Sequence, residues 1–180
     1  MNKMTNRMVP GYPLEKGFTL VECLIVVAVF GILIAAAAPP MSRFMQAMQA
    51  RQNTNDLMSS LLLARSEAVT RNVNVTMCMI DQAAPGVCDN SKDWEDGWIA
   101  FEDLDRDGIR DVGEDVVDEH SGMDNTTVVT TANFATSVRY TPSGAVWSAG
   151  NMTICVAGEV ARRIFINATG RPRMADGACP

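Results

Sequence analysis

The sequence predicts an α+β protein in which one long N-terminal α-helix packs on a small antiparallel β-sheet domain. Three observations support this prediction. Residues 18–38 are almost wholly apolar, with Glu22 and Cys23 as their ionisable groups. From Phe44 to Val69, apolar residues recur mainly at three- and four-residue steps, as they do in an amphipathic helix. After Asn72, short strand-like segments alternate with turn signals.

The predicted helix runs from Phe18 to about Arg71 and has two halves. At about 1.5 Å per residue, residues 18–40 are long enough to cross the roughly 30 Å apolar core of a bilayer. Residues 41–72 form the amphipathic half, whose apolar side should pack on the β domain. The residues of that side are Phe44, Met48, Leu57, Met58, Leu61, Leu62, Ala68 and Val69.

Residues 73–180 are expected to form the C-terminal β-rich globular domain. Turn signals such as Asp107-Gly108 and Ser143-Gly144 lie close to the strand-like segments and favour local hairpins, hence an antiparallel sheet. The predicted strands are Val73–Ile80, Gly97–Glu102, Val116–Glu119, Thr126–Thr131, Ser137–Tyr140, Met152–Val156 and Ala161–Ile166.

The charge of the first seventeen residues sets the expected orientation. They carry three basic residues, Lys3, Arg7 and Lys16, against Glu15. By the positive-inside rule this end stays in the cytoplasm and the C-terminal part is exported. The alternative, an ordinary signal peptide or membrane anchor, is less well supported. A secretory signal has a shorter apolar region, a small-residue cleavage site and no carboxylate inside it.

Glu22 needs a partner, because a carboxylate inside an apolar membrane segment is costly. If the chain were cut after Gly17, Phe18 would carry a free α-amine. That cation could pair with Glu22 of a neighbouring subunit, so one cut would turn a membrane segment into a self-assembling one.

The segment Lys16-Gly17-Phe18-Thr19-Leu20-Val21-Glu22 resembles the class III leader and cleavage site of type IV pilins and type II secretion pseudopilins. The resemblance implies that residues 1–17 are a leader peptide, and that a prepilin peptidase cuts after Gly17 and methylates Phe18. It also implies that Glu22 guides docking into the filament. The implied fold is the type IV pilin fold.

Residues farther along the chain narrow the resemblance to one group of minor pilins, the GspH/FimT group. It is carried by residues 57–68, by Trp94-Glu95-Asp96-Gly97-Trp98 and by the acidic loop that follows. The implied protein is a single-pass protein of the bacterial inner membrane with a periplasmic C-terminal domain, later assembled into an extracellular pilus. Its implied partners are major and minor pilins, the peptidase and the inner-membrane assembly machinery.

Four cysteines lie beyond the apolar segment, on the side where export makes disulfides possible. They allow three connectivities, of which the pairing of sequence neighbours is favoured: Cys78 with Cys88, and Cys155 with Cys179. Cys23 is expected to act as a small apolar residue. A metal site built from these cysteines is rejected, because there is no CxxC spacing and His120 is the one histidine.

Residues 81–124 are strongly acidic, with fifteen acidic against three basic residues. Residues 103–114 fit the D-x-D-x-D-G-x5-E calcium pattern, whose ligands would be Asp103, Asp105, Asp107, Asp111 and Glu114. However, Arg110 occupies a position that is usually aliphatic, and the flanks resemble strands rather than helices. We predict a solvated acidic hairpin loop without a cofactor, with calcium as the alternative.

The C-terminal part is basic, with five arginines against two acidic residues from Asn125 onward. Gly170 and Pro172 predict a turn that holds Arg171 and Arg173 apart, and a Cys155–Cys179 bridge would fix the tail against the strand Met152–Val156. This Gly-Arg-x-Arg pattern resembles the C-terminal motif of FimT-type pilins implicated in DNA capture. Guanidinium groups suit phosphates, and Arg162 and Arg163 could extend the patch. Alternatively, these arginines cap carbonyls or pair with the acidic loop.

The sequence therefore predicts a minor type IV pilin that acts by assembly and by binding double-stranded DNA during natural transformation. No motif supports an enzyme. Two alternatives stay open: an initiating or tip pilin with no nucleic-acid role, and a GspH-like minor pseudopilin of a type II secretion system.

Overall fold

The computed structural model describes residues 17–84, 86–133, 136–158 and 160–180, without the side chains of residues 36–40. The predicted leader, residues 1–17, lies outside the described residues except for Gly17. Residues up to Met41 and residues from Ser42 onward form two separate compact units.

The predicted long helix is confirmed as α1, Leu20–Arg71, which continues through Pro39 and Pro40. It ends where Asn72 adopts a left-handed conformation with φ of 58°. Within the described residues, no helical stretch combines the length and apolar content needed to cross a membrane. The predicted span over residues 18–40 draws on residues 36–40, whose side chains are outside the described set, and it stays a prediction.

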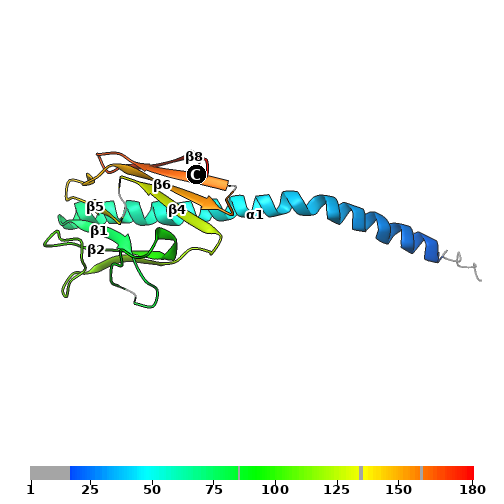
Figure 1. The fold of residues 1–180 in the computed structure, drawn as a ribbon, viewed down its shortest axis with the longest axis horizontal. Coiled ribbons are helices and arrows are strands. Elements are labelled where there is room, and N and C mark those ends of the chain that lie inside the picture. Colours follow the sequence, from blue (N-terminus) through cyan, green and yellow to red (C-terminus); the bar gives the residue numbers. More distant parts are fainter. Residues whose placement is uncertain (1–16, 85, 134–135, 159) are drawn as a thin grey trace, which may run out of the picture. The chain divides into compact units, whose positions relative to one another are not determined.

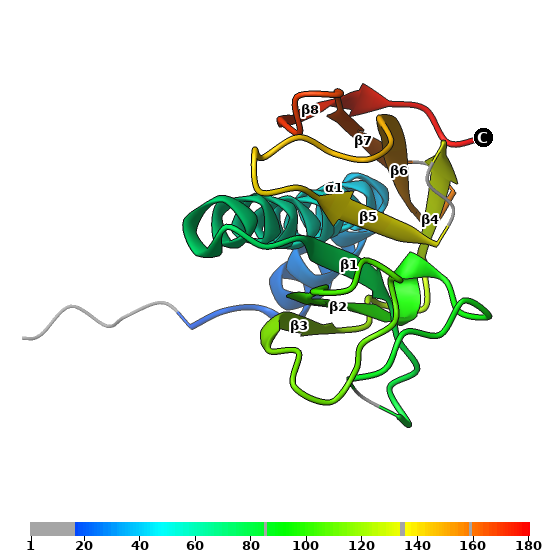
Figure 2. The ribbon, with the colours of Figure 1, turned by 90° about the vertical axis from the view of Figure 1, so that its left-hand side faces the viewer.

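Residues from Ser42 onward form two antiparallel four-stranded sheets with the C-terminal half of α1 between them (Figures 1 and 2). One sheet has the order β3-β2-β1-β5 and the other β4-β6-β7-β8. A short 3-10 helix, Trp94–Asp96, precedes β2. The strands are β1 Val75–Met79, β2 Gly97–Glu102, β3 Val116–Ser121, β4 Thr127–Ala132, β5 Ser137–Tyr140, β6 Gly150–Val156, β7 Val160–Ile166 and β8 Pro172–Gly177.

The main core lies where the inner faces of both sheets meet α1. The helix buries a stripe at alternating three- and four-residue steps, formed by Leu57, Leu61, Ala64 and Ala68. Opposite it lie buried side chains of both sheets, which include Met77, Trp98, Tyr140, Met152, Ile154, Ile164 and Ile166. The predicted apolar side was therefore only partly right. Phe44, Met48, Leu62 and Val69 are exposed, because the helix is apolar on more than one side and its sequence does not mark which side is buried.

The outer faces of the two sheets differ. Over β1 and β2, a second small core of Cys78, Ile80, Ile99 and Phe101 lies with Cys88 of the disulfide loop, residues 80–96. On the outer face of the other sheet, Val128 of β4 and Phe165 of β7 are exposed. The second sheet therefore presents a solvent-accessible face.

The C-terminal tail adds one strand to those predicted. The predicted bridge does join the tail to β6, at Cys155. The sequence did not predict, however, that Pro172–Gly177 forms an eighth strand, β8, which pairs with β7 from Ile166↔Pro172 to Ala161↔Gly177. The sequence of β8 has little strand propensity. The strand therefore forms because it pairs with β7, and not because its residues prefer an extended conformation.

Candidate functional sites

The N-terminal motif begins α1 with a reciprocal cap. The backbone N–H of Glu22 donates to Thr19 Oγ1 at 3.2 Å, and the N–H of Thr19 donates to Glu22 Oε2 at 3.5 Å. This is a capping box, which satisfies two of the unpaired donors at a helix start. The sequence reasoning missed this role of Glu22, although the Thr-x-x-Glu spacing was its signal. Phe18 and Glu22 are both exposed and line one hollow with Cys23, Val26 and Val27.

The Gly-Arg-x-Arg motif lies at the tight connection between β7 and β8. Gly170 N–H donates to the carbonyl oxygen of Asn167 at 2.8 Å, and Arg171 N–H donates to Asn167 Oδ1 at 3.1 Å. Gly170 is buried with φ of 73°, and a Cβ built there would collide with the carbonyl oxygen of Gly144. Glycine is therefore required both for the backbone conformation and for the close approach of the turn around Gly144.

The side chains of Arg171 and Arg173 are exposed and make no hydrogen bond or ion pair with any part of the chain that the structure describes. Pro172 between them is buried, so the alternation along a strand turns both arginines toward solvent. The alternative in which these two arginines cap carbonyls or pair with the acidic loop finds no support among the described contacts.

Arg65 of α1 belongs to the same site as Arg171, an association that the sequence could not indicate. The two arginines line one groove together with residues of the connections 143–145 and 168–169. Arg65 Nε donates to the carbonyl oxygen of Gly144 at 2.9 Å, across 79 residues of sequence. This contact orients a second guanidinium at the same end of the domain.

Arg162 and Arg163 point to opposite faces of β7, as strand alternation requires. Arg162 Nη1 forms an ion pair with Asp176 Oδ1 at 3.0 Å, and Arg162 lines a hollow with residues of α1. Arg163 lies on the outer face, where its Nε donates to Thr153 Oγ1 at 3.0 Å. The structure thus brings Arg163 to the same sheet face as Arg173 and places Arg162 on the other side.

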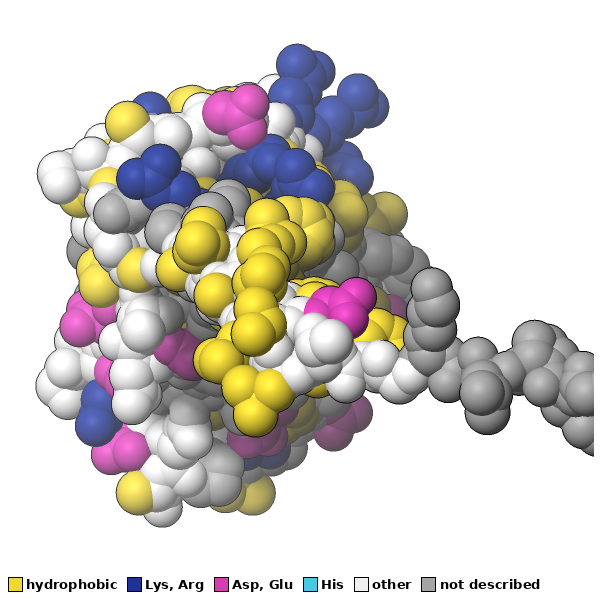
Figure 3. Space-filling view, turned by 90° about the vertical axis from the view of Figure 1, so that its right-hand side faces the viewer, with side chains coloured by type: hydrophobic (Ala, Val, Ile, Leu, Met, Phe, Trp, Pro, Cys, Tyr) yellow, Lys and Arg dark blue, Asp and Glu magenta, His cyan; other side chains and the backbone are white. Residues whose placement is uncertain are grey.

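Charge is segregated between the two sheets. Lys and Arg side chains gather at the upper part of the domain in Figure 3, the part that holds β6 and β8 in Figure 1, while most acidic side chains lie lower. Arg162, Arg163, Arg171 and Arg173 lie on β7, on β8 or in the connection between them and belong to the basic part. The acidic loop, residues 103–115, joins two strands of the other sheet. An acidic protein therefore presents a basic surface.

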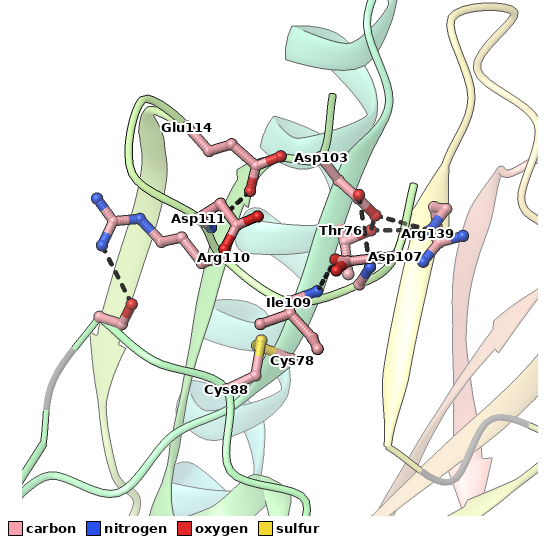
Figure 4. Close-up of a disulfide and its surroundings, with 12 residues drawn as sticks. Thr76, Cys78, Cys88, Asp103, Asp107, Ile109, Arg110, Asp111, Glu114 and Arg139 are labelled. Carbon is pink, nitrogen blue, oxygen red and sulfur yellow. Dashed lines mark hydrogen bonds and ion pairs between the residues drawn. A yellow bond between two sulfur atoms is a disulfide. The ribbon is translucent and has the colours of Figure 1, made fainter. Parts of the chain in front are cut away.

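The acidic loop is held closed by its own side chains. Asp103 is fully buried, and its Oδ2 pairs with Arg139 Nε at 2.9 Å and accepts a hydrogen bond from Thr76 (Figure 4). Glu114 is also buried and accepts backbone N–H groups of Leu104 and Asp111 at 2.8 and 2.9 Å. Both buried carboxylates thus have partners from the chain.

The predicted calcium ligands do come together in part. Carboxylate oxygens of Asp103, Asp105 and Glu114 lie within 4.8 Å of one another, as do those of Asp105, Asp107 and Asp111. The second group is exposed. Asp105 and Asp107 accept backbone N–H groups of Asp107 and Ile109, at 3.2 and 2.7 Å. These backbone contacts shape the loop, and calcium binding stays a prediction to be tested.

Both predicted disulfides are confirmed: Cys78 is bonded to Cys88 and Cys155 to Cys179. The first ties the disulfide loop onto β1, and the second joins the end of the chain to β6. Among the described cysteines, Cys23 is free and exposed.

A long N-terminal helix packed on antiparallel sheet, with the C-terminus held by a disulfide, is the architecture of a type IV pilin. The chain belongs to the family described as type II transport protein GspH, whose family model matches residues 53–170. The prokaryotic N-terminal methylation motif matches residues 13–38. The protein is thus of the minor pilin and pseudopilin class, whose members assemble with other pilins. No curated protein sequence matches it.

Two solved structures illustrate the shared fold. The type IV minor pilin FimU of Pseudomonas aeruginosa PAO1 has 20% sequence identity and a TM-score of 0.58, over 73% of this chain and 92% of that chain. The minor pseudopilin EpsH from the type 2 secretion system of Vibrio cholerae has 14% identity and a TM-score of 0.52, over 71% of this chain and 97% of that chain. At these identities the similarity shows the fold alone.

Proposed function

We propose that this chain is a minor type IV pilin that binds extracellular double-stranded DNA for uptake in natural transformation, with Arg171 and Arg173 as its main contacts. The observation that carries the proposal is that both guanidinium groups are exposed and unpaired among the described residues. Two other arginines of the domain have acidic partners: Arg139 pairs with Asp103, and Arg162 pairs with Asp176. An unpaired guanidinium on a stiff hairpin loses no existing partner when it binds a phosphate.

The surroundings support the same proposal. Gly170 shapes the turn, Arg65 adds a guanidinium to the groove beside Arg171, and Arg163 adds one on the sheet face near Arg173. Such contacts would be independent of DNA sequence and strongly dependent on salt, because phosphate binding releases counterions. The acidic loop lies on the other sheet, so it would face away from the bound DNA.

The test is duplex binding by the full chain in a zwitterionic detergent across a salt series. The Arg171→Ala, Arg173→Ala double variant should bind more weakly and should reduce the slope of log K against log salt by about 2, one for each lost phosphate contact. An Arg71→Ala, Lys92→Ala double variant removes the same charge from ion pairs elsewhere, and its slope should stay near that of the wild type. Equal effects of the two double variants would contradict the proposed site.

A second candidate function is a subunit with no nucleic-acid role, at a pilus tip or in a type II secretion pseudopilus. The description of the matching family favours a place in type II transport. If the duplex does not bind even at low salt, the function without a nucleic-acid role is the better supported of the two. The chain would then be expressed in strains that lack the corresponding minor pilin or minor pseudopilin. If it restores secretion but not pili, it belongs to a type II secretion pseudopilus rather than to a pilus.

Assembly through the N-terminal motif is part of both functions. We propose cleavage after Gly17, methylation of Phe18 and docking through Glu22, in a subunit first anchored in the inner membrane with its C-terminal domain in the periplasm. A bulkier residue at Gly17 should leave an uncleaved precursor on a gel. Because Glu22 also caps α1, Glu22→Ala would disturb both the charge and the cap. Glu22→Gln keeps the capping side chain, so loss of filament incorporation by this variant would isolate the charge.

A further inference from the structure

The outer face of β7 and β8 carries an exposed aromatic ring between two arginines. Phe165 is 42% exposed, whereas the neighbouring β7 residues Ile164 and Ile166 are buried on the inner face. An exposed aromatic side chain in the middle of a solvated sheet face gains little from its position in the folded chain. It is available to a ligand.

Arg163 is already oriented beside this ring. Its guanidinium carbon lies 5.7 Å from the centroid of Phe165, within the range of a cation–π contact. Its Nε donates to the hydroxyl of Thr153, which is itself buried on β6. An arginine has five N–H donors, so the four on its two terminal nitrogens keep their capacity for a ligand while the side chain is held in place.

Arg173 completes the arrangement from the neighbouring strand. The register of β7 and β8 places Arg173 directly opposite Phe165, and Arg163 opposite Ala175. Directly opposed side chains on one sheet face have Cβ atoms about 5 Å apart, and diagonal neighbours are about 7–8 Å apart. Phe165 is therefore bracketed by two guanidinium groups, one of which has no partner among the described residues.

We infer that this face, formed by Arg163, Phe165 and Arg173, binds unpaired nucleotides of DNA: a base stacks on Phe165 and the adjoining phosphates contact the two arginines. Flat sheet faces with exposed aromatics and basic neighbours suit unstacked bases, and every base offers a π-face. A duplex would use the arginines alone, because its bases are stacked on one another inside the helix. The inference rests on the proposed DNA binding and adds to it a preference for single-stranded or frayed segments.

The test compares three probes of equal length with the full chain in a zwitterionic detergent: a fluorescein-labelled thymidine 20-mer, its abasic counterpart and a 20-base-pair duplex. Phe165→Leu keeps an apolar side chain without a ring, and Phe165→Tyr keeps the ring. We expect Phe165→Leu to weaken binding of the thymidine strand about tenfold, with the Tyr variant near wild type. Abasic and duplex binding should change less than twofold. Each variant is first checked for an unchanged melting temperature.

The outcomes separate the inference from the function on which it rests. If Phe165→Leu does not weaken thymidine binding, or weakens all three probes alike, base stacking is wrong. Duplex binding that still depends on Arg171 and Arg173 would then leave the proposed function intact. If no probe binds at low salt, both proposals fail. If DNA binding is absent and Phe165→Leu instead prevents incorporation into filaments, the face packs against a neighbouring subunit and the inference is overturned.

Discussion

Gly170 offers a sharp test of the geometry at the Gly-Arg-x-Arg motif. Two separate costs are expected when it is replaced by alanine. Its φ of 73° is a left-handed conformation that an L side chain adopts at about 1–2 kcal/mol. The new Cβ would also collide with the carbonyl oxygen of Gly144 and lie 3.2 Å from Tyr140 Cε1. Both neighbours belong to fixed structure, since one is backbone and the other is a buried ring.

Gly158 is the matched control. Its φ is 70°, and a Cβ built there meets nothing within 4 Å among the described atoms. Gly158→Ala should therefore cost the backbone strain alone, about 1–2 kcal/mol of unfolding free energy. Gly170→Ala should cost about 2 kcal/mol more, the usual size of an overpacking penalty. The difference between the two variants measures the close approach of the two turns.

The assay is urea unfolding of the compact unit Ser42–Pro180 under oxidising conditions, followed by tryptophan fluorescence. Trp94 and Trp98 are buried, so unfolding exposes both of them. Equal losses of stability in the two variants would refute the argument, because they would mean that the turn around Gly144 does not press against Gly170.

Three further predictions test other parts of the domain. Cys179→Ser removes the bridge between residues 24 positions apart and should lower the unfolding free energy by about 3 kcal/mol; an unchanged urea midpoint under oxidising conditions would contradict the Cys155–Cys179 pair. Burial raises the pKa of Tyr140 above its ordinary value of 10.0, so the stability due to its neutral form is complete below about pH 10 and is lost as the pH rises through the folded-state pKa. Tyr140→Phe, which removes a buried hydroxyl with no described hydrogen-bond partner, should show a shallower alkaline loss of stability; identical pH profiles would count against this. Finally, millimolar calcium should change the melting temperature by less than about 1 °C relative to a chelator, because Asp103 and Glu114 already have partners within the chain; a clear rise would identify the acidic loop as a calcium site.

Much of the fold could be predicted because the local signals agree with the tertiary structure. The seven predicted strands lie within a few residues of β1 to β7, since each combines β-branched or apolar residues with a nearby turn. Sequence proximity also identified both disulfides. The strand β8 could not be predicted, because Pro172–Gly177 contains proline, aspartate and glycine and becomes a strand through its pairing with β7.

The candidate site was predictable only where contacts are local. The separation of Arg162 from Arg163 follows from the period of a strand and could have been inferred from the predicted segment Ala161–Ile166. The participation of Arg65 depends on its contact with Gly144, 79 residues away, and no local pattern encodes it. The role proposed for Phe165 likewise depends on the register that places Arg173 opposite it.

The position of β8 at the edge of its sheet has a consequence for a crowded filament. An edge strand leaves a row of backbone groups unpaired, and neighbouring subunits could extend the sheet by adding a strand of their own. Here the edge begins with Pro172, which lacks an N–H, and carries Arg173 and Asp176, which are both exposed. The disulfide from Cys179 holds the tail that follows the strand. Proline and charge are the usual protection against edge-to-edge pairing, so Pro172 and Arg173, which belong to the proposed DNA-binding surface, also help to keep the subunits from aggregating through this edge.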